Sequence, residues 1–128
     1  MASDLTLSRD GILASIARLQ LRLNVELRRV AASPATLQQK NSVRDLTHEL
    51  TLRLNEASAD VDTSGDPAPV WNGWVHDSIA PRLQTLSVLL NQVLGDPLGV
   101  CTYDEGQFCS TQAECDLPNS SWSQGGCP

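Results

Sequence analysis

The sequence has few aromatic residues, with three Trp, one Tyr and one Phe among 128 residues. Leucine and the other aliphatic side chains must therefore supply most of any core. Long apolar runs are missing as well, and no stretch approaches the roughly 18 consecutive apolar residues that a membrane-spanning helix needs. We therefore expect one small soluble protein with no membrane span.

Basic residues are absent from Leu83 to the end of the chain. Residues 1–82 carry nine basic and ten acidic side chains, whereas residues 83–128 carry five acidic ones, which is −5 of the net charge of −6. Proteins bind phosphate backbones with clustered Lys and Arg, so this balance argues against nucleic acid as a partner. The asymmetry predicts two segments with different roles.

Cysteine is absent from the first 100 residues, and then four follow, at Cys101, Cys109, Cys115 and Cys127. The spacing contains no C-x2-C pair of the kind that places two thiolates on one zinc ion. Two disulfides are the better interpretation, and three pairings are open. Disulfides form in oxidising compartments, so a bonded tail predicts an extracytoplasmic location.

Residues 8–32 carry the clearest helical pattern, with one apolar face made by Ile12, Ile16, Leu19, Leu23, Leu27 and Val30. Ser8 is suited to the N-cap. From Leu19 to Leu27 apolar residues also alternate with polar ones, which is the pattern of a strand, but the longer pattern favours a helix. Leu21 and Val25 then lie opposite the main apolar face, where they are available to another helix or another chain.

Two further helices follow from the same spacing. Ser33-Pro34 predicts the start of the second, whose apolar face consists of Val43, Leu46, Leu50, Leu54, Ala57 and Val61. Residues 60–69 read as a polar loop, and a third helix is expected from near Asp77 or Ser78, with Pro81 in its first turn. Gly95-Asp96-Pro97 ends it.

The predicted fold class is therefore all-α. It is a three-helix bundle, an antiparallel hairpin plus a third helix, followed by an irregular four-Cys tail. Residues 1–97 form the helical region, and residues 98–128 form the tail, which requires disulfides because it has too few apolar residues to build a core.

One stretch resembles half of a calcium-binding loop. Oxygen ligands fall at alternate positions in Asp60, Asp62 and Ser64, with Gly65 and Asp66 next. The second half does not fit, because Trp71 occupies the position of the bidentate Glu. Side chains that cap a polar turn explain the same residues, so this is a weak metal candidate.

No nucleophile elbow, phosphate loop or dinucleotide-binding turn is present. We therefore expect neither an enzyme nor a cofactor, and interpret the chain as a binding or structural module. Self-association or a protein partner would use Leu21 and Val25, and the tail would contribute Tyr103, Phe108 and Trp122 as exposed aromatic anchors.

An alternative comes from a resemblance in composition. Ribosomally synthesised, post-translationally modified peptides have a helical leader followed by a core rich in Cys, Ser and Thr. Residues 100–128 resemble such a core, with Thr102, Ser110, Thr111, Ser120, Ser121 and Ser123 among the four cysteines. The resemblance implies a leader at residues 1–95, cleavage at Leu94-Gly95 or Leu98-Gly99, a modifying enzyme as partner and a cytoplasmic location.

Overall fold

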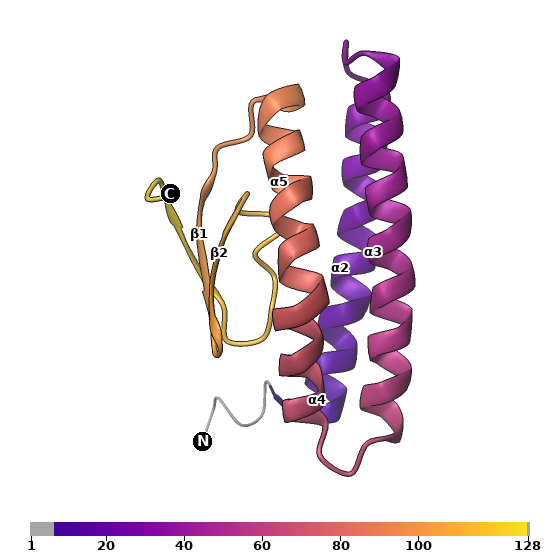
Figure 1. Cartoon of the computed structure of the whole chain (residues 1–128), viewed down its shortest axis with the longest axis vertical. Helices are drawn as coiled ribbons and strands as arrows, with labels where there is room; N and C mark the ends of the chain where they lie inside the picture. The colour runs from indigo at the N-terminus through magenta and orange to yellow at the C-terminus, as the bar shows by residue number, and fades with distance from the viewer. Residues whose placement is uncertain (1–6, 128) are drawn as a thin grey trace.

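A computed structural model describes residues 7–127 of the chain. Three long helical columns stand side by side, and a small sheet lies beside the third of them (Figure 1). The first two columns are α2 (Arg9–Ala31) and α3 (Leu37–Thr63). The third runs without a break through α4 (Pro67–Trp74), the π-helical turn η1 (Val75–Ile79) and α5 (Ala80–Leu94). In the part of the chain that is described, no helix combines the length and apolar character that crossing a membrane requires.

The α2–α3 hairpin follows the predicted pattern. Ser8 caps α2 by accepting a hydrogen bond from the backbone N–H of Gly11, and the predicted face is buried, except that Leu27 is only partly covered. The second helix begins three residues later than Ser33-Pro34 predicts. Thr36 and Gln39 form a reciprocal capping box at its start, which fixes the boundary there.

The third column corrects the prediction for residues 60–81. The expected polar loop is mostly helical, because α3 continues to Thr63 and Pro67 occupies the first turn of α4. Pro81 is in the first turn of α5, as predicted, but α5 continues from η1 without a break, so the proline also removes one hydrogen bond and crowds the preceding turn. The wider turn of η1, in which the N–H of Ala80 donates to the carbonyl of Val75, comes directly before it and relieves this crowding.

The tail is a sheet, so the predictions of an all-α fold and of an irregular tail were wrong. Strands β1 (Gly99–Tyr103), β2 (Gly106–Ser110) and β3 (Ser121–Gln124) are antiparallel in the order β2-β1-β3. Alternate residues of β1 and β2 are buried, among them Cys101, Tyr103 and Phe108. This two-residue period extends over only five residues in each strand, which is too short to distinguish from irregular chain in the sequence.

Both expected disulfides are present, as Cys101–Cys115 and Cys109–Cys127. The buried side chains of the sheet, together with Leu117, belong to the same apolar core as the helices. The division into residues 1–97 and 98–128 stays a prediction.

Candidate functional site: a groove between α2 and the disulfide loop

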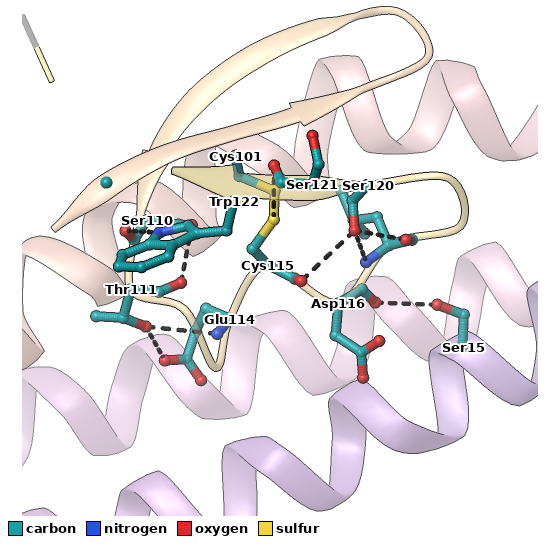
Figure 2. Close-up of a disulfide and its surroundings, with 12 residues drawn as sticks. Ser15, Cys101, Ser110, Thr111, Glu114, Cys115, Asp116, Ser120, Ser121 and Trp122 are labelled. Carbon is teal, nitrogen blue, oxygen red and sulfur yellow. Dashed lines mark hydrogen bonds between the residues drawn. A yellow bond between two sulfur atoms is a disulfide. The ribbon is translucent and has the colours of Figure 1, made fainter. Parts of the chain in front are cut away.

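The loop at residues 111–116, which follows β2, is held on α2. Its Cys115 is bonded to Cys101 in the central strand (Figure 2). From α2, the Ser15 hydroxyl donates to the backbone carbonyl of Asp116 at 3.0 Å. The Arg18 guanidinium donates to the Asp116 carboxylate, with Nε to Oδ2 at 3.1 Å and Nη2 to Oδ1 at 3.3 Å. The disulfide thus ties this loop to β1, and the Ser15 hydrogen bond and the forked ion pair of Arg18 join it to α2.

An open groove of about 400 Å³ lies between the loop and the helix. One wall is the loop, and the other is formed by Arg18, Leu21, Arg22 and Val25 of α2. Leu21 is 67% exposed and Val25 is 40% exposed, which is high for aliphatic side chains one helical turn apart. The groove therefore presents apolar surface next to two guanidinium groups.

Two buried glutamates lie next to the groove, one on each of the two segments that form its walls. Glu26 follows Val25 on α2, and Glu114 lies on the loop with its side chain turned toward the helices (Figure 2). Both residues are fully buried, and the Oε2 atom of each has no protein partner by the usual donor and acceptor geometry. Buried charge is costly unless it is paired, so the contacts of the other oxygens matter.

Glu26 and Glu114 have different partners. The Oε1 atom of Glu26 accepts from Arg29 at 2.8 Å, and Arg29 also forms a forked pair with Asp96. The Thr111 hydroxyl donates to Oε1 of Glu114, and its oxygen accepts the Glu114 backbone N–H at 3.4 Å. Glu26 therefore has a cation beside it, whereas Glu114 has a neutral hydroxyl.

Burial is the largest cause that raises the pKa of Glu114, and a hydrogen bond with the Glu26 carboxyl is the second. Together they bring this pKa to about 8. The Thr111 hydrogen bond and the charge of Arg22 act in the opposite direction and are weaker. Glu114 thus keeps its proton near neutral pH. The protonated carboxyl has a hydrogen to donate, and the Glu26 side chain is its hydrogen-bonding neighbour.

The residues that the sequence predicts as partner contacts differ in exposure in the structure. Leu21 and Val25 lie on the groove, as described above. Tyr103 and Phe108 are only 8% exposed, and their rings meet edge to face with centroids 6.0 Å apart, so they lack the exposure that an anchor role assumed. Trp122 is partly buried and donates its indole N–H to the carbonyl of Ser110 at 2.9 Å.

The calcium candidate is not assembled as a ring of ligands. Asp60 and Asp62 lie within α3, where the Asp60 carboxylate accepts the indole N–H of Trp74 at 2.8 Å. Ser64 ends that helix, and its hydroxyl accepts the backbone N–H of Asp66 at 3.0 Å. Within residues 7–127, no group of three or more His, Cys, Asp or Glu side chains is arranged to hold a metal ion.

Sequence reasoning missed the buried glutamates, although one signal for them was present. The apolar spacing of α2 runs through Leu23, Glu26 and Val30, so a glutamate occupies a position on the buried face. Charged residues are almost never fully buried without a partner, which marks Glu26 as unusual. Glu114 gives no comparable signal in a segment without periodicity.

Comparison of the chain with family models, with curated proteins and with solved structures gives no match. A function must therefore be argued from the site itself.

Proposed function

We propose that the protein is a non-catalytic binding module whose docking surface is the groove between α2 and residues 111–116. The observation that carries this proposal is the exposure of Leu21 and Val25 beside a loop that is held in place before any partner arrives. Apolar groups that lose water on binding supply affinity, and a wall that is already ordered lowers the entropy cost of association. The groove is open and its walls carry no paired catalytic groups. It is therefore better suited to dock a side chain of a protein partner than to act as an active site.

The occupant we propose is a helical segment of another protein that combines apolar residues with Asp or Glu. In a chain of net charge −6, α2 is the basic element, with five Arg against one Asp and one Glu. Arg18 and Arg22 line the groove itself, where Arg18 is already paired with Asp116. Acidic residues on a partner would pair with Arg22 while its apolar residues cover Leu21.

A symmetric pair of copies fits this surface less well. A two-fold axis through the groove would bring Arg22 of one copy close to Arg22 of the other, whereas Arg18 is already paired with Asp116. Like charges across an interface are unfavourable, so Arg22 disfavours this arrangement. Self-association through Leu21 would appear as a dimer in sedimentation and would contradict the proposed occupant.

The experiment is a display selection of helical peptides on the oxidised protein, with affinities then measured by fluorescence anisotropy. We expect selected peptides to carry apolar residues flanked by Asp or Glu. Leu21→Ser should weaken their binding about tenfold, the loss expected for one buried aliphatic side chain. Leu52→Ser is the matched control, because Leu52 is an exposed leucine (48%) on α3.

Two results would contradict the proposal. One is a selection that enriches no peptide above background. The other is a set of peptides whose affinity responds equally to Leu21→Ser and Leu52→Ser, because binding would then not depend on the groove. The alternative of a modified-peptide precursor stays a prediction, which the intact mass of the natively produced protein tests, since dehydration of Ser or Thr lowers that mass.

A further inference from the structure

The buried carboxyl pair connects the two walls of the groove. Glu26 is adjacent in sequence to Val25 on the helix wall, and Glu114 lies between Ala113 and Cys115 on the loop wall. Both are fully buried, and two of the three buried polar atoms without a partner in residues 7–127 are their Oε2 atoms. The hydrogen bond between the two carboxyl groups joins the loop wall to the helix wall.

The charged groups around the pair do not neutralise two carboxylates. From α2, Arg29 contacts Glu26 but also holds Asp96, the second residue after α5. Arg22, also from α2, acts on Glu114 only through its charge, as a weak influence. The loop contributes the Thr111 hydroxyl, which is neutral. One proton shared between the two glutamates removes the negative charge that these groups do not neutralise.

We propose that Glu26 and Glu114 form a proton-dependent latch that holds residues 111–116 on α2 and thereby regulates the groove. Its regulatory part rests on the proposed function of the groove, whereas the latch itself does not. With the proton in place, the two carboxyls share a hydrogen bond and the loop wall is closed. Loss of the proton leaves two like charges side by side where both side chains are buried, and their repulsion loosens the loop from the helix against the Ser15 and Arg18 contacts to Asp116.

The direction of the pH dependence follows from the raised pKa. Glu114 titrates at about 8 in the folded protein against an ordinary value of 4.5. The folded state therefore binds the proton more tightly than the unfolded state, and the contribution of Glu114 to the free energy of unfolding is fully present below pH 4.5. This contribution falls between pH 4.5 and about 8, where the unfolded chain has lost the proton that the folded pair still holds, and it is gone above about pH 8, where the folded pair loses the proton as well. The groove is thus formed at mildly acidic and neutral pH and loosens in alkaline solution.

The first test is a titration of the wild-type protein by carbon-13 NMR of the side-chain carboxyl groups. We expect Glu114 to titrate close to pH 8 and the backbone amides of residues 111–116 to shift with the same midpoint. This experiment needs no variant. A Glu114 carboxyl that titrates in the ordinary range, or loop amides that do not follow it, would overturn the latch.

A matched pair of variants tests the mechanism. Glu114→Gln keeps the shape of the protonated side chain, so the alkaline shift of the loop amides should disappear. Glu105→Gln is the control, because Glu105 is an exposed glutamate in the β1–β2 turn whose one hydrogen bond is to Asn72 at 3.4 Å. It should leave the transition unchanged. A transition that persists in Glu114→Gln would assign it to another group and overturn the latch.

The link to the groove has its own measurement. A peptide selected on the protein should bind about tenfold more weakly at pH 9 than at pH 6.5, while Glu114→Gln binds it equally at both. An NMR transition without any change in peptide affinity would overturn the regulation. If no peptide is selected at all, the proposed function fails, but the NMR titration still decides whether the latch exists.

Discussion

Arg29 is the residue on which the burial of Glu26 depends. Its guanidinium contacts Oε1 of Glu26 at 2.8 Å and both carboxylate oxygens of Asp96, so it joins α2 to the segment after α5. These two hydrogen-bonded partners are the main reason why the pKa of Arg29 is raised. The side chain of Glu26 is 0% exposed, and water therefore cannot replace Arg29 as its partner.

Replacement of Arg29 by Ala should lower the free energy of unfolding by about 3 kcal/mol, because it leaves a buried carboxylate without a counterion. Arg53→Ala is the control. Arg53 pairs with Glu49 and Glu56 on the exposed surface of α3, and such pairs contribute about 0.5 kcal/mol. Urea denaturation at neutral pH measures both. Equal losses would show that Glu26 finds another partner and that Arg29 is only a surface cation.

At the scale of elements, two glycines in the third column have opposite roles. Gly73 lies in α4, and a Cβ atom added there would meet nothing within 4 Å. Gly95 follows α5 with a φ of 74°, in the left-handed region where a side chain is strained. The first glycine is therefore replaceable, whereas the second is required by the backbone.

We expect Gly73→Ala to raise the free energy of unfolding by about 0.5–1 kcal/mol, because alanine loses less conformational entropy in a helix. Gly95→Ala should lower it by about 1 kcal/mol, the cost of a left-handed alanine. Thermal unfolding of the two variants provides the comparison, with each as control for the other. A loss of stability in Gly73→Ala would mean that the surface of α4 at this position does not tolerate a methyl group.

The sequence predicted elements best where a long period exists. The apolar face of α2, from Ile12 to Val30, identified both the helix and the exposed pair Leu21 and Val25. The start of the third helix was misplaced because Pro81 is read as an N-terminal signal, whereas a π-helical turn accommodates it here. The sheet was missed because its strands are only four or five residues long, which is too short for an alternating pattern to be distinguished in the sequence.

The molecule as a whole is held together across the boundary between helices and sheet. Cys101, Tyr103 and Phe108 pack into the core that the helices form. In addition, the Gln84 side chain of α5 accepts the backbone N–H of Cys109 at 3.0 Å, which covers part of the β2 edge. The sheet thus stabilises the scaffold while it positions the loop of the groove.

We expect the two disulfides to reduce the entropy of the unfolded chain equally, but to differ in their effect on peptide binding at the groove. They link residues 14 and 18 positions apart, so each should stabilise the fold by about 3 kcal/mol through chain entropy. Of the two disulfides, Cys101–Cys115 is the one that includes a residue of the loop at 111–116. Replacement of that pair by Ala should therefore abolish selected-peptide binding and the alkaline NMR transition, while replacement of Cys109 and Cys127 lowers stability but preserves both. Urea denaturation and peptide anisotropy on the two double variants make the comparison, and equal loss of peptide binding would show that the groove depends on the sheet as a whole.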